Sequence, residues 1–407
     1  MEKPLEGIRI LDLSRILAGP YCSMLLADMG AEVIKVERPG KGDDTRAFGP
    51  PFIEGESAYF LSINRGKKSI TVNFKKDKGR EIIYQLIKKS DVLLENFRPG
   101  TLDKIGLGYE TIEKINPQII YTSISGFGQI GPERLKAGYD LTVQGMGGIM
   151  SLTGDPSGPP YKVGTSISDI LAGIYACQGI LLALIARNKN GKGQKVDVSM
   201  LDCQVSLLTY QAGIYFATGL VPKRKGNQHP TICPYETFKA SDEYINIAIG
   251  NDKLWQKFCD LLAPLEKNSL TGLGLKEIKD DPKFSSNPKR VENRDELFLI
   301  IGKIIREKKA QEWLKIFDGE GIPAGPILSV DKVLSHPQVL AQEMVVEVNH
   351  PKSGKIKLTG IPVKLSATPG SIDKPPPLLG EHNDEVLSHI LGYSKEEIKS
   401  LKEEGVI

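Results

Sequence analysis

The chain has 407 residues, of which 40% are hydrophobic and 25% are charged, and its formal net charge is +3. The length favours two domains, and the composition is typical of a soluble globular protein. The near-neutral charge and the scattered lysines argue against a nucleic-acid partner.

Five cysteines lie far apart in the sequence, and none belongs to a CxxC motif or a Cys/His cluster. We therefore expect neither a disulfide framework nor a bound metal. The N-terminus, MEKPLEGIRILDLS, has early acidic residues and no long apolar core, which argues against a signal peptide. Together these features predict a cytoplasmic protein.

The first 130 residues alternate between strand-like and helix-like segments. Strands are predicted at Ile8–Leu13, Ala31–Val36, Ser69–Phe74, Asp91–Phe97 and Ile119–Ser123, and helices at Tyr21–Met29, Lys78–Lys89 and Leu102–Ile115. Repeated βαβ units predict an α/β fold with a Rossmann-like parallel sheet and helices on both of its faces. Residues 40–62, rich in Gly, Pro and polar groups, are expected to form a long loop.

An uncharged stretch, Ile170–Ala186, follows a single carboxylate, Asp169. The stretch is near the lower length of a membrane span, but Gln178 and several small residues favour a buried core helix and no membrane. The helix dipole and the free N–H groups of the first turn favour an ionised Asp169, which would be a plausible nucleophile toward an activated acyl group. On position alone, an ordinary cap or first-turn residue is the favoured interpretation.

The second half of the chain changes character after a polar linker, Val221–Pro234. Before the linker we expect a strand at Lys195–Met200 and a helix over 202–219; after it, a strand at Tyr244–Ile249, helices at Leu254–Leu262 and Arg294–Phe317, a segment Gly354–Leu358, and short helices at Asn383–Leu391 and Lys395–Glu403. This order predicts a large α/β domain from residues 1–220 and 330–407 and a small α+β domain over residues 225–330.

Several motifs have a functional and a plain interpretation. Gly126–Gly131 matches GxGxxG, but no helix of the required length follows, so a tight turn or a close backbone approach is favoured over a dinucleotide site. Glu95–Gly100 ends a parallel strand, where open sheets bind ligands, although a strand-to-helix turn explains it as well. Arg and Lys residues that follow predicted strands, among them Arg38, could bind phosphate groups, and a basic surface in contact with solvent explains them equally well. His229 is more simply a turn residue, and no Ser/His/Asp pattern occurs.

Many short motifs, in order along nearly the whole chain, resemble the class III CoA-transferase family, which includes formyl-CoA transferase, carnitine CoA-transferase and 2-methylacyl-CoA racemase. The motifs are Pro4–Asp12, Ala18–Pro20, Gly30–Pro39, Asn64–Ser69, Glu95–Gly100, Gly126–Gln129, Gly191–Gln194 and Leu379–His382. The resemblance implies that each large domain is built from N- and C-terminal parts and that two protomers form an interlocked homodimer.

The resemblance also implies roles for individual residues. Asp169 occupies the position of the family's catalytic aspartate, which carries first an acyl group and then CoA. Coenzyme A, as an acyl-CoA substrate, would be held at positions matching Leu17, Ala18, Arg38, Val72, Lys75, Asn96, Phe97 and Lys104, the last of which is Arg in formyl-CoA transferase. Residues matching those near the acyl group are Tyr59, Tyr139 and Asp140, where formyl-CoA transferase has Glu in place of Asp140.

Three functions remain open at this point. A CoA-transferase acting on a carboxylic acid is favoured. A 2-methylacyl-CoA racemase needs two bases. By resemblance, the racemases of the family have a His at the position of Tyr139, and a tyrosine is a poor base near neutral pH. A non-catalytic acyl-CoA-binding protein is the third.

The absence of a glycine run near Lys225–Pro230 argues against formyl and oxalate substrates, and Tyr235–Phe238 resembles members acting on larger acids, including dicarboxylates, with succinyl-CoA as a candidate donor.

Overall fold

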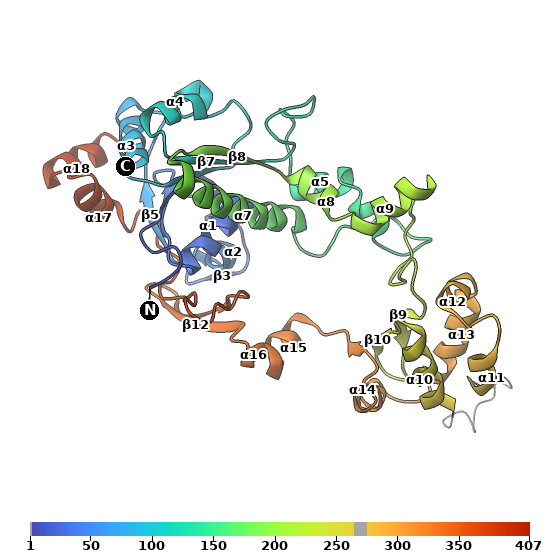
Figure 1. The fold of residues 1–407 in the computed structure, drawn as a ribbon. Helices are drawn as coiled ribbons and strands as arrows, with labels where there is room; N and C mark the ends of the chain where they lie inside the picture. Colours follow the sequence, from blue (N-terminus) through green and yellow to red (C-terminus); the bar gives the residue numbers. More distant parts are fainter. Residues whose placement is uncertain (1, 264–274) are drawn as a thin grey trace. The chain divides into compact units, whose positions relative to one another are not determined.

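A computed structural model of the chain describes residues 2–263 and 275–407 (Figure 1). The chain divides into two compact units. The first contains residues 1–150, 162–220 and 336–407, and the second contains residues 151–161 and 221–335. The second unit thus takes in a segment, 151–161, from before the expected linker, and it extends to residue 335. Residues 264–274, part of the expected small domain, lie outside the described residues.

The first unit is built on a six-stranded parallel sheet. Its strands are β1 (Arg9–Asp12), β2 (Glu32–Glu37), β5 (Lys67–Thr71), β6 (Val92–Glu95), β7 (Ile120–Ser125) and β8 (Gln194–Ser199). They lie in the order β5-β2-β1-β6-β7-β8. Numbered along the chain this is 3-2-1-4-5-6, the order of doubly wound nucleotide-binding sheets. The prediction of a parallel α/β sheet is confirmed.

Helices cover both faces of this sheet (Figure 1). On one face α1 (Ala18–Asp28) and α7 (Ile167–Asn190) pack with Ile10, Val33 and Leu94; on the other, α3 (Asp77–Lys88) and α4 (Tyr109–Ile115) pack with Leu11, Ile34 and Leu93. Neighbouring strand residues point to opposite faces, so the alternation of apolar residues in each strand feeds two separate cores. The result is a three-layered unit.

The C-terminal segment returns to the first unit, on the outer side of β5. His382 N–H donates to Ser69 O at 2.9 Å, and Asn73 N–H donates to Val406 O at 2.7 Å. Helix α18 (Lys395–Glu403) begins with a capping box at Ser394, and α17 (Asn383–Glu385) continues into a π-helical turn, Val386–Ile390. The short helix α16 (Pro337–Ala341) and a hairpin of β12 (Val345–His350) and β13 (Gly354–Thr359) precede them. Helix α15 (Val330–Leu334) belongs to the second unit.

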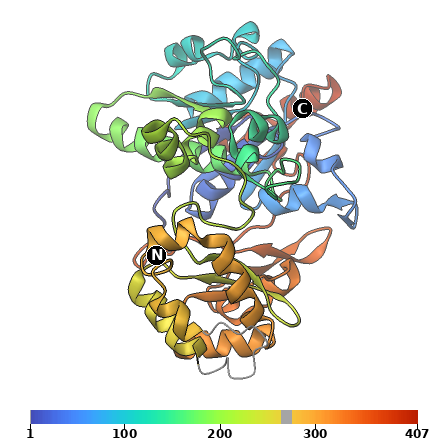
Figure 2. The same ribbon diagram turned by 90° about the vertical axis from the view of Figure 1, so that its right-hand side faces the viewer.

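The second unit, mostly yellow to orange in Figure 2, has a three-stranded antiparallel sheet. Its strands are β9 (Tyr235–Lys239), β10 (Tyr244–Ala248) and β11 (Ala324–Pro326), and its helices are α10 (Asp252–Leu262), α11 (Leu275–Asp280), α12 (Asn287–Glu292), α13 (Arg294–Ile305) and α14 (Ala310–Gly319). Its core contains Phe238, Trp255, Phe258 and Trp313. This is an α+β arrangement.

Four predicted elements differ from the structure. The helix expected over 102–115 is a short 3-10 turn, Asp103–Ile105, and α4, because Gly106 adopts a φ of +79° between them. The helix over 202–219 is broken into α8 (Met200–Ser206) and α9 (Thr209–Thr218), and the helix over 294–317 into α13 and α14. The expected loop 40–62 contains a 3-10 turn (Asp44–Ala47), the short strands β3 (Phe52–Ile53) and β4 (Glu56–Ser57), and most of α2 (Ala58–Ile63).

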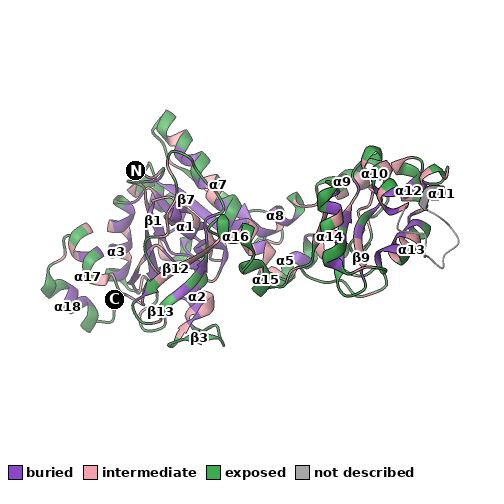
Figure 3. Cartoon of the chain, turned by 90° about the horizontal axis from the view of Figure 1, so that it is seen from below, coloured by how far each residue is buried: buried purple, intermediate pink, exposed green. Residues whose placement is uncertain are grey.

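Helix α7 is the one helix among the described residues that is long and apolar enough to cross a membrane by length and composition. A core helix of a soluble protein meets the same criterion. Its small residues, including Ala172, Gly173 and Ala176, are buried against α1 and the sheet. Ile174, Leu182 and Ile185 are exposed, and Figure 3 shows α7 with both buried and exposed stretches. The prediction of a buried core helix therefore holds for one face only.

Candidate active site

A cavity in the first unit lies beyond the carboxyl ends of the parallel strands. Its volume is about 690 Å³, within the range of about 300–1,000 Å³ typical of ligand pockets. Leu13, Ser14 and Arg15 after β1, Arg38 after β2, Val72 to Lys75 after β5, and Phe97 after β6 line it. Strands β1 and β6 mark the point where the strand order reverses, which is where open α/β sheets bind ligands.

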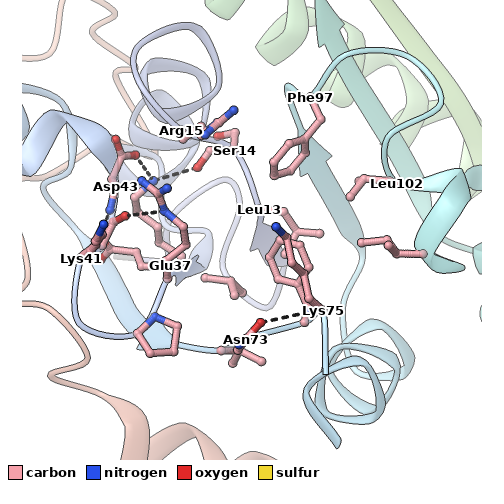
Figure 4. Close-up of a pocket in the computed structure, with 18 of the residues that line it drawn as sticks. Leu13, Ser14, Arg15, Glu37, Lys41, Asp43, Asn73, Lys75, Phe97 and Leu102 are labelled. Carbon is pink, nitrogen blue, oxygen red and sulfur yellow. Dashed lines mark hydrogen bonds and ion pairs between the residues drawn. The ribbon is translucent and has the colours of Figure 1, made fainter. Parts of the chain in front are cut away.

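Four of the predicted cofactor residues line this cavity: Arg38, Val72, Lys75 and Phe97. Phe97 and Leu102 lie on one side of it in Figure 4, and Lys41 and Asp43 lie on the other. Phe74 meets Phe97 edge to face, with 6.3 Å between the ring centroids. The cavity thus joins apolar surface to a cationic rim, which suits a ligand that has both a flat ring and phosphates.

The other predicted cofactor residues have different positions. Asn96 uses its amide to bind the backbone of Arg15: Oδ1 accepts from Arg15 N–H at 2.9 Å and Nδ2 donates to Arg15 O at 2.7 Å. Lys104 is exposed on the 3-10 turn and does not belong to the cavity lining. Leu17 and Ala18 are buried at the start of α1, outside the lining. Asn96 therefore shapes the site indirectly.

Asp169 lies in the first turn of α7 and is partly buried. The N-cap is Ser166, and Asp169 is an acidic residue of the first turn, one of the two positions that the plain interpretation allows. Ala18, at the start of α1, gives Asp169 a backbone hydrogen bond. The two helices approach closely here, since a Cβ built on Gly173 would lie 2.7 Å from Ala18 O. Glycine at position 173 lets α7 deliver Asp169 to the start of α1.

The pKa of Asp169 is raised to about 7 by burial and by the negative charge of Asp140, and the hydrogen bond from Ala18 only partly offsets these effects. The position of Asp169 at the helix start is therefore not enough to keep its carboxylate fully ionised, as the sequence had suggested. Desolvation penalises the charged form more than one backbone donor favours it. A group with a pKa near 7 is divided between its acid and its carboxylate at neutral pH.

Asp140 is the first residue of α5 (Asp140–Met146) and serves α7 as a capping group. Its Oδ1 accepts from Ser168 N–H at 3.0 Å, and its Oδ2 accepts from Gln144 Nε2 at 2.8 Å. Gln144, fully buried, accepts from Val163 N–H at 2.8 Å through Oε1. This carboxylate–amide chain holds the segment that enters α7. The sequence offered no signal for Gln144, because its burial depends on the approach of three separate segments.

The two predicted tyrosines differ. Tyr59, on α2, is partly buried, and burial followed by the charges of Asp169, Asp43 and Asp140 raises its pKa to about 12, so the phenol stays protonated. It is therefore a hydrogen-bond donor in the field of Asp169. Tyr139 precedes α5 and is 68% exposed. The structure thus brings together Asp169, Asp140, Tyr59 and Ala18, and leaves Tyr139 at the surface of the described chain.

The cavity and Asp169 are connected by one turn, Leu13–Ala18. A buried charge network fixes this turn: Lys35 Nζ donates to Ser14 O at 2.9 Å and pairs with Asp43 at 2.8 Å, and Asp43 accepts from Ile16 N–H at 3.2 Å. Ile16 adopts a φ of +69°, a strained conformation for a β-branched residue. Sequence reasoning missed Lys35 and Asp43 in this role.

The GxGxxG motif has a structural explanation. A Cβ on Gly126 would lie 2.7 Å from Gly138 Cα, so the glycines permit a close approach of two backbone segments. This approach is between two segments of the chain itself. Across residues 2–263 and 275–407, no group of His, Cys, Asp or Glu side chains is arranged to hold a metal.

Comparison with known proteins decides the family. The model of the family described as "CoA-transferase family III" matches residues 5–383 of the chain. The chain belongs to this family. It is a CoA-transferase, and the resemblance found in its motifs is confirmed.

Relatives agree over the full length of the chain. It is 46% identical over 405 residues to the mouse succinyl-CoA:glutarate CoA-transferase, covering 100% of this chain and 90% of that protein. It is 41% identical over 393 residues to the succinate–glutarate CoA-transferase of Agrobacterium fabrum, covering 95% and 96%. Among solved structures, a CAIB/BAIF family protein from Brucella suis has a TM-score of 0.83 at 42% identity, with 96% of this chain and 100% of that chain covered.

Proposed function

We propose that this CoA-transferase moves CoA from succinyl-CoA to a second dicarboxylic acid of the size of glutarate, with Asp169 as the covalent nucleophile. The position of Asp169 carries the proposal: a partly buried carboxylate at the start of α7, bonded by Ala18 and one turn away from the cavity. The printed activities of the two relatives support the choice of substrates.

The proposed exchange has four balanced steps. The Asp169 carboxylate attacks the donor's thioester carbonyl carbon, the C–S bond breaks, and CoA thiolate leaves a mixed anhydride on the enzyme. The thiolate attacks the Asp169 carbonyl, which releases succinate and forms an aspartyl-CoA thioester. The acceptor carboxylate displaces the thiolate to give a second anhydride. The thiolate then attacks the acceptor's acyl carbon and frees Asp169. Two anhydrides and a thioester replace one difficult exchange.

Neighbouring groups fit these steps. Tyr59 stays protonated, and its pKa is raised in part by the charge of Asp169. Its hydroxyl group can therefore donate a hydrogen bond to the negative charge that develops on the thioester oxygen during attack. Ala18 N–H supplies a second donor on the Asp169 side. Burial of Asp169 raises its nucleophilicity by limiting its hydration and excludes the water that would hydrolyse an anhydride.

The experiment is a trapping assay joined to a substrate panel. Wild-type enzyme incubated with succinyl-CoA and then digested is expected to yield a peptide containing Asp169 with the added mass of bound CoA. Asp169→Asn is expected to lose the adduct and at least about a thousandfold of transfer activity. Full activity in Asp169→Asn contradicts the nucleophile.

The panel tests the substrates. Succinyl-CoA with glutarate is expected to react faster than with acetate, formate or oxalate. A preference for a monocarboxylate contradicts the dicarboxylate proposal. Exchange of an α-hydrogen of 2-methylacyl-CoA with solvent deuterium, without an acceptor acid, indicates the racemase instead. CoA binding without turnover on any pair indicates the non-catalytic alternative.

A further inference from the structure

We propose that Arg15 binds a phosphate of CoA together with Arg38, and that Asp44 is an internal counter-ion which holds both guanidinium groups in the ligand-free protein and is displaced when CoA enters. The proposal rests on the CoA binding that the function above requires. It assigns a binding role to Arg15 and a competing role to Asp44.

One carboxylate bridges the two arginines. Asp44 Oδ2 lies 3.1 Å from Arg15 Nη1, and Asp44 Oδ1 pairs with Arg38 Nη2. Arg15 follows β1 and Arg38 follows β2, and both line the 690 Å³ cavity. Two guanidinium groups that share one anion at the end of adjacent parallel strands form the arrangement that a phosphate also requires.

The remaining charges leave these arginines available. Inside the site, Lys35 pairs with Asp43, and Arg46 pairs with Glu37 at 2.7 Å through side chains that are less than a tenth exposed. Those pairs neutralise themselves. Lys41 and Lys75 also line the cavity, and neither ammonium has an ion-pair partner among the described residues. The cavity lining therefore has four further cations, Arg15, Arg38, Lys41 and Lys75. Asp44, which lies outside the lining, pairs with the first two.

Arg15 is held over the cavity by its neighbours. The Asn96 side chain binds both its N–H and its C=O, and its guanidinium carbon lies 5.4 Å from the centroid of the Phe97 ring. Figure 4 shows Arg15 next to Ser14 and facing Phe97 across the cavity mouth. The strained turn at Ile16 fixes the backbone on the other side. The backbone of Arg15 is thus fixed, and its side chain is 44% exposed.

Exchange of Asp44 for phosphate follows from exposure and charge. The side chains of Arg15, Arg38 and Asp44 are 44%, 50% and 33% exposed. Ion pairs exposed to this degree are weak. The 3′-phosphate of CoA is a dianion with three terminal oxygens, and the diphosphate carries one charge on each of its two phosphate groups, so either offers two guanidinium groups more charge and more oxygens than one carboxylate does. In the free protein, Asp44 keeps the arginines from repelling each other, and in the complex it competes with the ligand.

The test measures CoA binding by titration calorimetry, independently of turnover. Asp44→Asn is expected to bind CoA about three- to tenfold more tightly, because one or two exposed ion pairs no longer compete. Arg15→Gln is expected to bind about tenfold more weakly. In Arg15→Gln/Arg38→Gln the effect of Asp44→Asn is expected to vanish, since the competition acts through these two side chains. Dephospho-CoA, which lacks the 3′-phosphate, distinguishes the phosphates: an unchanged Arg15→Gln effect places Arg15 on the diphosphate.

A matched control is Asp384→Asn. Asp384 pairs with Lys402 at 2.7 Å, is 72% exposed and lies outside the cavity lining. It changes the net charge by the same amount, and CoA affinity is expected to stay within about twofold of wild type.

The salt dependence of CoA affinity is a second measurement, which would not change if Asp44 had only a structural role. The fall in CoA affinity with rising salt is expected to be steeper in Asp44→Asn, because the cations then face the ligand without a counter-ion. Unchanged or weaker CoA binding in a folded Asp44→Asn protein overturns the inference, as does equal tightening in the Arg15→Gln/Arg38→Gln background. Wild-type protein that binds no CoA overturns the proposed function itself, which is a distinguishable result.

Discussion

Two carboxylates lie at the junction of α5 and α7, and they differ in environment. Asp140 receives hydrogen bonds from Ser168 N–H and from Gln144, whereas Asp169 is bonded by Ala18 and is desolvated. Burial, and after it the negative charge of Asp140, raises the pKa of Asp169. For a nucleophile this environment has two effects. It makes the carboxylate more basic and reactive, and it makes the reactive form dependent on pH.

The pH dependence of transfer follows from the pKa of Asp169, about 7. Below this pH the carboxylic acid predominates, so the rate is expected to fall as the pH decreases from 7 to 5. Asp140→Asn removes the neighbouring charge and lowers the pKa of Asp169. The acidic limb of the pH–rate profile is therefore expected to move to lower pH, whatever the change in the maximal rate.

Initial rates between pH 5 and 9 measure this shift, and Asp384→Asn provides a control with the same change of net charge. An acidic limb at the same pH in Asp140→Asn as in wild type would show that another group controls it.

Between helices, the crossing of α1 and α7 positions the candidate nucleophile. Gly173 lets the two backbones touch at Ala18, the residue whose backbone binds Asp169. Cys22 of α1 and Ala176 and Ile180 of α7 belong to the same core cluster. A buried interface of small residues tolerates little added volume, so its geometry is transmitted directly to the site.

Gly173→Ala is expected to lower the free energy of unfolding by about 1–3 kcal/mol, because its Cβ would lie 2.7 Å from the backbone oxygen of Ala18 and would push the two helices apart. The same displacement is expected to lower kcat more than the affinity for CoA, since Asp169 and the cavity lie on opposite sides of the turn Leu13–Ala18. Urea unfolding and steady-state kinetics measure the two effects.

Gly302→Ala on α13 is the matched control, because a Cβ there meets nothing within 4 Å. It is expected to be neutral or slightly stabilising, by up to about 1 kcal/mol. Equal behaviour of the two variants would show that the helices move apart without cost.

For the whole molecule, the outer face of α7 is the feature that the single chain leaves unexplained. Ile174, Leu181, Leu182 and Ile185 follow helical spacing and are all exposed. Soluble proteins rarely expose such a continuous apolar surface unless a partner covers it. We propose that a second copy of the chain covers this face, which agrees with the homodimer implied by the family resemblance.

Light scattering coupled to gel filtration is expected to give about twice the mass of one chain, and Leu182→Glu/Ile185→Glu is expected to reduce it to the monomer, because burying two carboxylates is costly. Leu299→Glu, on an exposed residue of α13, serves as a control that keeps the dimer. A wild-type monomer, or a dimer unaffected by both glutamates, contradicts this assignment of the interface.

The sequence by itself determined the parallel sheet, because the strands and helices in the first 130 residues carry their own apolar periodicity. It also determined the family, and it singled out Asp169, Arg38, Lys75 and Phe97. The sequence predicted one helix over 294–317 where the structure has two, because the periodicity of α13 continues into α14 although the backbone turns between them.

Only the tertiary structure decided the chemistry of these residues. The pKa of Asp169 depends on burial and on Asp140, which is 29 positions away in the chain. The roles of Asn96, Lys35, Asp43 and Asp44 depend on contacts between the ends of separate strands. Electrostatic effects are set by distances through space and by solvent exclusion, and a sequence pattern records neither, so local periodicity gave the sheet while the fold gave the site its charge state.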